Sequence, residues 1–162
     1  MAIQVMSWLL AIPLLGAATG LRSMTPMAVV CWYAYTGYLP LDEAWDQWPM
    51  KLSVAIIFTA LALGEIVADK LPFIPNRTSL APFLFRILMA GMAGAMAADA
   101  LNGSHSEGIL LGVAGALFGT FAGFMIRRDL VEKIGCPDWQ IALAEDIFTI
   151  SCAIFALHIV TS

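Results

Sequence analysis

Long apolar stretches dominate this chain and constrain its fold more than any other feature. Six of them follow one another, at residues 3–20, 24–41, 52–68, 80–98, 108–126 and 139–160. A membrane-spanning helix needs about 20 mostly apolar residues, with about 17–25 as the usual range. Because each stretch has roughly that length, the pattern predicts an all-α bundle of about six transmembrane helices.

The composition excludes the common soluble classes. Of the 162 residues, 60% are hydrophobic and 12% are charged, whereas average soluble domains have about 45–50% apolar and about 25% charged residues. A chain of this length has too large a surface-to-volume ratio to bury so much apolar surface in a soluble core. We therefore expect a single transmembrane domain over residues 1–162, and not an ordinary soluble enzyme, a disordered protein or a coiled coil.

Each of the first two stretches allows a second interpretation besides a transmembrane helix. Residues 3–20 end on small residues, as a signal peptide does, but no Lys or Arg precedes them, so we expect a retained helix. In the second stretch, Thr25 can cap the helix N-terminus and Pro26 can occupy the first helical position. Prolines near both of its ends leave a re-entrant hairpin as the alternative to a full crossing.

The basic residues divide unequally between the two sides of such a bundle. With six crossings, one side carries Arg22, Lys70, Arg77, Arg127, Arg128 and Lys133, and the other carries Lys51. The positive-inside rule then places the first group in the cytoplasm and both termini on the opposite side. The acidic loop at residues 42–50, which contains two tryptophans, suits the outer interface.

Small residues recur in the fifth stretch, at Gly108, Gly112, Gly115, Gly119 and Gly123. They share a narrow stripe of a helix, and small faces let helix backbones approach closely in lipid. Since residues 90–98 are also rich in Gly and Ala, we predict a tight hairpin of the fourth and fifth helices. A subunit interface in a homo-oligomer is the alternative. Short echoes between residues 62–65 and 142–145 give slight support for an inverted repeat.

Ionisable residues inside apolar stretches are costly in a membrane and usually face the bundle interior or a wet cavity. Those at similar depth here are Glu65, Asp69, Arg86, Glu145 and Asp146. Glu65 and Asp69 are four residues apart and so share one helix face. Arg22 and Ser23 lie at the same level, in the turn between the first two helices. We expect these residues to line one hydrated site that binds a substrate or an ion.

Such a site suits proton or cation coupling. Convergence lets Arg86 pair with one or two carboxylates while others remain able to titrate, and arginine also suits bidentate contact with a carboxylate or phosphate. The alternative is a structural ion-pair network. Residues 20–26 and 75–79 also place arginines and hydroxyls at helix N-termini, which favour anions such as a free or lipid-bound phosphate. Simple capping explains the same residues.

Other chemistry has little support in the sequence. His105 and His158 are far apart, and the three cysteines are scattered, so neither set has the spacing of a metal site or a disulfide framework. No nucleophile elbow, phosphate loop or zinc signature occurs. We expect no metal and no cofactor. The net charge of −4 also argues against a nucleic-acid partner, which needs a basic face.

Three segments resemble the DUF4126 family of small bacterial integral membrane proteins. They are residues 20–26 (GLRSMTP), 65–72 (EIVADKLP) and 75–78 (PNRT), followed by Arg86 and Gly91. The resemblance covers most of the chain. It implies a multi-pass protein of the bacterial inner membrane, and it supplies no activity and no catalytic residues.

Three functions are consistent with the sequence. The favoured one is a small transporter or channel-like protein that moves a small solute, an ion or protons past the carboxylates and Arg86, with Arg22 and Asp69 at its cytoplasmic mouth. The second is a membrane protein that binds or processes a lipid phosphate, and the third is a non-catalytic structural oligomer. Membrane lipids are expected partners in every case. The sequence favours a protein that is not an enzyme.

Overall fold

The computed structural model describes residues 2–41, 47–68, 80–135 and 137–161. These residues form the helices α1 (Ala2–Leu21), α2 (Met24–Tyr35), α3 (Leu52–Ala68), α4 (Leu80–Ala100), α5 (His105–Asp129) and α6 (Asp138–Thr161). A 3-10 turn, η1 (Trp48–Met50), precedes α3, and a π-helical turn, η2 (Leu130–Ile134), follows α5. No strand occurs within the described residues, and the predicted all-α fold is confirmed.

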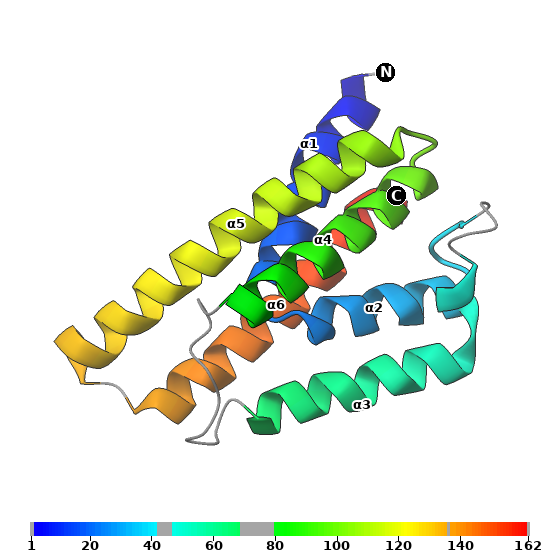
Figure 1. Ribbon diagram of the computed structural model, residues 1–162. Coiled ribbons are helices and arrows are strands. Elements are labelled where there is room, and N and C mark those ends of the chain that lie inside the picture. Colours follow the sequence, from blue (N-terminus) through cyan, green and yellow to red (C-terminus); the bar gives the residue numbers. More distant parts are fainter. Residues whose placement is uncertain (1, 42–46, 69–79, 136, 162) are drawn as a thin grey trace.

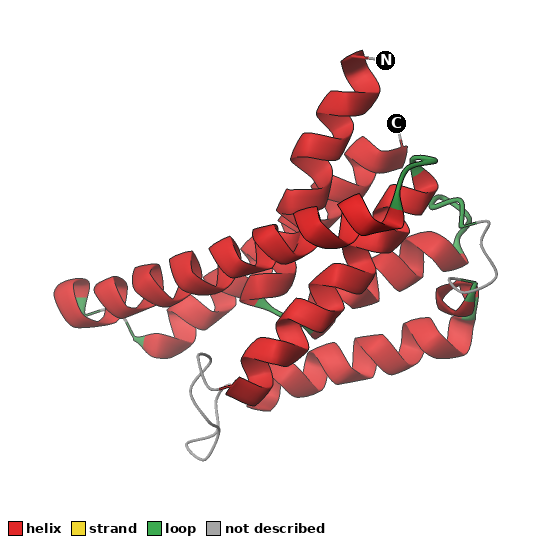
Figure 2. Ribbon diagram, turned by 45° about the horizontal axis from the view of Figure 1, so that its top comes forward, coloured by secondary structure: helices red, strands yellow, loops and turns green. Residues whose placement is uncertain are grey.

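The body of the bundle consists of α1, α4, α5 and α6, and α2 and α3 lie side by side along one flank (Figure 1). Its core is formed by side chains such as Ile12 of α1, Met27 of α2, Met96 of α4 and Leu157 of α6. The N- and C-termini lie at the same end of the molecule in both ribbon views (Figures 1 and 2). The last turns of α5 and the first turns of α6 form the opposite end.

The outer surface of the bundle is apolar. Leu63, Leu110 and Phe118 are 60%, 70% and 72% exposed, which water would disfavour and lipid would not. By length and composition, Leu80–Ala100, His105–Glu132 and Trp139–Thr161 are each able to cross a membrane. The apolar stretches Trp8–Leu21 and Leu52–Ala68 are shorter. The chain is therefore a membrane protein.

The helix α2 is shorter than the sequence predicted, because it ends at Tyr35 and not near residue 41. The Gly37 backbone adopts a left-handed φ of 77°. Its amide donates to the Ala34 carbonyl at 3.1 Å, and the Tyr38 amide donates to the Tyr33 carbonyl at 3.0 Å. This pair of hydrogen bonds is the Schellman motif that terminates helices. The 12 residues of α2 span about 18 Å, which is too short to cross a hydrocarbon core of about 30 Å.

The start of α2 also differs from the prediction. The expected N-cap was Thr25, with Pro26 in the first helical position, but α2 begins at Met24 and its N-cap residue is Ser23. The Ser23 side chain makes no capping hydrogen bond to the helix. A side chain from another helix supplies that cap, as the site geometry shows.

The glycines of α5 permit two close helix contacts. A Cβ added at Gly108 or Gly112 would overlap a backbone carbonyl of α4, and one added at Gly115 or Gly119 would overlap a backbone carbonyl of α1. A Cβ at Gly123 would meet a leucine side chain of α1. The stripe thus packs against α4 over its first half, as the predicted hairpin requires, and against α1 over its second half, which the sequence argument did not foresee.

Candidate functional site

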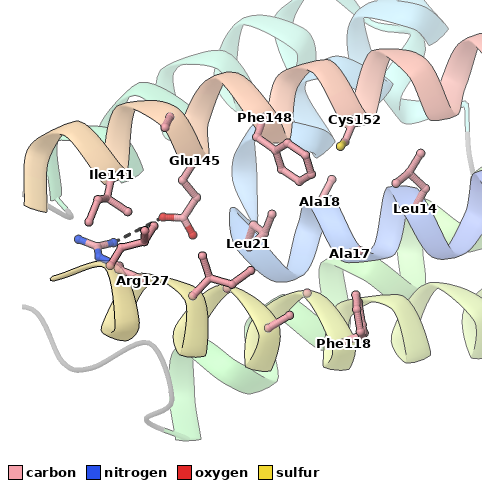
Figure 3. Close-up of a pocket in the computed structure, with 16 residues that line it drawn as sticks. Leu14, Ala17, Ala18, Leu21, Phe118, Arg127, Ile141, Glu145, Phe148 and Cys152 are labelled. Atoms are coloured by element: carbon pink, nitrogen blue, oxygen red, sulfur yellow. Dashed lines mark ion pairs between the residues drawn. The ribbon is translucent and has the colours of Figure 1, made fainter. Parts of the chain in front are cut away.

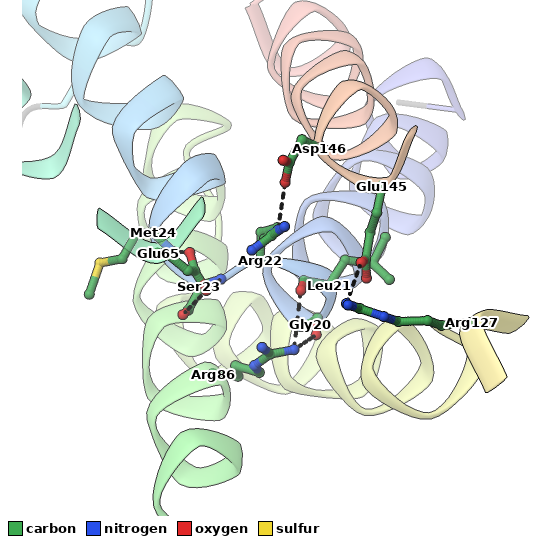
Figure 4. Close-up of polar contacts among 10 residues, drawn as sticks. All are labelled: Gly20, Leu21, Arg22, Ser23, Met24, Glu65, Arg86, Arg127, Glu145 and Asp146. Atoms are coloured by element: carbon green, nitrogen blue, oxygen red, sulfur yellow. Dashed lines mark hydrogen bonds and ion pairs between the residues drawn. The ribbon is translucent and has the colours of Figure 1, made fainter. Parts of the chain in front are cut away.

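The junction between α1 and α2 lies inside the bundle. Between the end of α1 at Leu21 and the start of α2 at Met24 stand only Arg22 and Ser23, which are 0% and 6% exposed. Each helix end leaves backbone amides or carbonyls without partners inside the helix. A buried end must therefore find those partners in other parts of the protein. Figure 4 shows the side chains that supply them.

Glu65, near the end of α3, caps the N-terminus of α2 (Figure 4). Its carboxylate accepts hydrogen bonds from the Ser23 amide at 3.0 Å, the Ser23 hydroxyl at 2.9 Å and the Met24 amide at 2.9 Å. A negative charge at this position also interacts favourably with the positive end of the helix dipole. The anion expected at this helix N-terminus is thus supplied by the protein itself, while residues 75–79, the other expected anion site, all lie outside the described residues.

Arg86, on α4, satisfies the C-terminal end of α1. Its Nη1 donates to the carbonyls of Gly20 at 2.6 Å and Leu21 at 3.1 Å. The Thr120 hydroxyl of α5 donates to the same Gly20 carbonyl at 3.0 Å. A cation suits the negative end of a helix dipole. Arg86 was predicted to pair with one or two carboxylates, and the structure shows that it also binds backbone carbonyls, a role that sequence spacing does not reveal.

Arg22 forms a buried ion pair with Asp146 of α6. The Nε of Arg22 lies 2.6 Å from Oδ1 of Asp146, and Asp146 is 6% exposed. Arg22 was predicted to lie at the cytoplasmic mouth of the site, but the structure buries it completely, because the helix break lies within the bundle. Removing one partner alone would leave the other charge buried and uncompensated.

We call the four charged residues at this junction, Arg22, Glu65, Arg86 and Asp146, the helix-break cluster. They come from the α1–α2 junction and from α3, α4 and α6, so residues distant in the sequence meet at one level of the bundle. Two are cations and two are anions, which balances their formal charges. Each of them holds a helix end or a charge of another element. The cluster therefore ties the α1–α2 junction to α3, α4 and α6.

Glu145 does not join the helix-break cluster, although it precedes Asp146 in the sequence. Consecutive helical residues point about 100° apart. The Oε2 of Glu145 lies 3.5 Å from Nη1 of Arg127, at the end of α5. Both side chains line an apolar groove between α1, α5 and α6 (Figure 3). Glu145 was predicted to join the other carboxylates, and its pairing with Arg127 was not predicted, although the short link between α5 and α6 indicates that such residues are neighbours.

The remaining candidates lie elsewhere. Asp69 is outside the described residues. His105 contacts Asp99 at 3.0 Å beside the α4–α5 turn, at the other end of α4 from Arg86. Thr120 is a participant that the sequence argument missed, and its position directly after Gly119, on the face of α5 that packs against α1, is the signal that could have identified it.

Comparison with known proteins shows which family the chain resembles. A family model described as Domain of unknown function (DUF4126) matches residues 9–160, which confirms the resemblance noted in the sequence. That range includes every member of the helix-break cluster and both charged residues of the groove. Neither a curated protein nor a solved structure matches the chain.

Proposed function

Because the chain belongs to the DUF4126 family, a domain of unknown function, we propose a function from the geometry of its own residues. The protein is a small transporter or channel-like protein that moves a small solute, an ion or protons across the bacterial inner membrane. The observation that carries this proposal is the buried break between α1 and α2, with the Arg22–Asp146 ion pair beside it.

An interrupted helix inside a membrane bundle supports transport. Secondary transporters bind substrates and coupling ions at discontinuous helices, whose free ends face charged groups. Here the ends are held by Glu65 and Arg86. Buried ion pairs are often no more stable than apolar packing of the same volume, so stability alone is a weak reason for a chain to keep these charges in a membrane.

The cycle that we propose uses the two carboxylates of the helix-break cluster. Proton uptake by Asp146 releases the guanidinium of Arg22, which can then bind an anion or change partner. Proton uptake by Glu65 weakens its hydrogen bonds to the start of α2. Since Glu65 belongs to α3 and Asp146 to α6, protonation alters how α2 is held between its neighbours and couples proton binding to its movement.

The orientation belongs to the same proposal. Arg127 and Arg128 lie in the last turn of α5, and that end of the bundle is opposite the two termini (Figure 1). The positive-inside rule places the arginine end in the cytoplasm and both termini outside it. The helix-break cluster would then be reached by protons from the cytoplasmic side.

A flux assay tests the proposal. The purified protein is reconstituted into vesicles with a pH-sensitive dye inside, and a pH gradient is imposed with sodium, potassium, chloride or phosphate as the test ion. We expect flux for at least one of these conditions and a loss of at least about tenfold in D146N, because a neutral amide cannot take up the proton. Glu107→Gln, at the other end of α5, is the matched control and should keep wild-type flux. Absence of flux with every test ion, or wild-type flux in D146N, would overturn the proposal.

A second variant separates transport from a merely structural ion pair. Replacing both partners, R22M/D146L, removes both charges without leaving one of them buried alone, so the fold should persist. Thermal unfolding in detergent checks this. A folded double variant without flux supports the proposal. A folded double variant with wild-type flux would show that the pair serves only to hold the helices together.

A further inference from the structure

The groove between α1, α5 and α6 has a volume of about 460 Å³ and holds neither Arg22 nor Asp146 in its lining. Small residues such as Ala17, Gly119 and Ala144 leave its space open, and larger ones such as Leu14, Phe118 and Phe148 wall it. Phe118 and Phe148 are 72% and 59% exposed. The groove therefore opens on the apolar outer surface of the bundle, where lipid chains lie.

The shape of the groove fits one hydrocarbon chain. Along α6 its lining runs from Ile141 to Cys152, which is about 16 Å at a rise of 1.5 Å per residue. The open length and the almost wholly apolar lining suit a flexible hydrocarbon chain.

The charged groups of the groove are confined to one end. Arg127 and Glu145 lie beside Ile141, far from Leu14 and Cys152 at the other end (Figure 3). The Arg127 side chain is 19% exposed. Glu145, at 3.5 Å from Nη1, holds the guanidinium at the mouth of the groove. A guanidinium has five N–H donors and forms charge-assisted hydrogen bonds with phosphate oxygens.

We propose that this groove binds an anionic phospholipid, with one hydrocarbon chain along the apolar walls and the headgroup phosphate on Arg127. The apolar length accounts for the chain, and the arginine at one end accounts for the headgroup. Basic residues near a membrane surface attract anionic lipids. Neutral phospholipids share the chain but lack the net negative charge, so Arg127 discriminates between the two classes. This site is independent of the proposed transport through the helix-break cluster.

Native mass spectrometry of the full chain in detergent tests the site. Phosphatidylglycerol and phosphatidylcholine with identical chains are added separately, and the fraction of protein that retains one lipid is measured. Both lipids carry a phosphate, but the choline ammonium offsets its charge in phosphatidylcholine, so we expect about fivefold stronger retention of phosphatidylglycerol, as about 1 kcal/mol of attraction to a net negative charge provides. Equal retention of the two lipids by the wild-type protein would overturn the proposal. So would a dimer that disappears when the groove is filled, because a second copy would then be its occupant.

Three variants locate the binding. Ala144→Phe fills the groove and should abolish retention of either lipid. The double variant R127Q/E145Q removes both charges together and should abolish the preference for phosphatidylglycerol while the chain still binds. Arg128→Gln, one residue outside the lining of the groove, should keep the preference of the wild-type protein. Loss of the preference in R128Q but not in R127Q/E145Q would refute the assignment to Arg127. Thermal unfolding confirms that each variant is folded.

Discussion

Replacement of Glu65 by glutamine tests the physical account of the helix break. In the wild-type protein the two carboxylate oxygens accept hydrogen bonds from the amides of Ser23 and Met24 and from the Ser23 hydroxyl. Glutamine has one carbonyl oxygen and one NH₂ group, so one side of the cap changes from acceptor to donor. At least one amide at the start of α2 then loses its partner, whichever way the glutamine side chain turns.

The expected loss of stability follows from these contacts. A buried donor without an acceptor costs about 1–3 kcal/mol. Removal of the negative charge from a partly buried helix N-terminus costs a further amount of about 0.3–2 kcal/mol. We therefore expect Glu65→Gln to lower the free energy of unfolding by about 1–5 kcal/mol.

The assay is an unfolding titration with sodium dodecyl sulfate in detergent micelles, followed by far-UV circular dichroism. Glu107→Gln is the matched control, because Glu107 also lies in the first turn of a helix, α5, but is exposed. Glu107→Gln removes the same charge but no interhelical hydrogen bond, so we expect little change in its free energy of unfolding. If E65Q unfolds within about 0.5 kcal/mol of the wild-type protein, as an ordinary surface substitution does, the cap does not hold α2 and the reasoning fails.

Two further predictions concern packing and orientation. Gly112→Ala should lower the free energy of unfolding by about 1–3 kcal/mol, because its Cβ would overlap the Ala90 carbonyl. Gly64→Ala should be neutral or stabilising by up to about 1 kcal/mol, since a Cβ there meets nothing within 4 Å; equal effects of the two in the same titration would contradict the close contact of α4 with α5. For the orientation, alkaline phosphatase fused to the C-terminus should be active, as it requires export from the cytoplasm. Activity of a cytoplasmic reporter at that position would reverse the proposed topology.

The outlines of the helices could be predicted from the sequence, but both ends of α2 could not. Residues 52–68 were predicted as the third helix, and α3 has those bounds. The end of α2 depends on Gly37, a local signal for a helix C-terminus that the sequence argument did not use. Its start depends on Glu65, which lies 41 residues from Met24 in the chain. No local pattern around Met24 reveals a cap that arrives from another helix.

The level of the candidate site within the bundle could be predicted from the sequence, but the contacts between its side chains could not. Counting residues from the helix ends placed Glu65, Arg86 and Asp146 at one level, and the structure brings them together around the helix break. The same counting could not separate Asp146 from Glu145, because that separation depends on which face of α6 meets α1. The buried position of Arg22 likewise followed from packing, since a two-residue junction can lie at the surface or inside a bundle.

The amino-acid sequence alone determined that this chain is helical, belongs in a membrane and carries charges at a shared depth. Those properties depend on the length of apolar runs and on the distance of a residue from a helix end. Both are obtained by counting residues along the chain. Only the tertiary structure decided that Arg22 pairs with Asp146 and that Glu65 caps α2. Such contacts depend on how the helices rotate and approach one another, and here the glycines of α5 set that approach by admitting the backbones of α1 and α4.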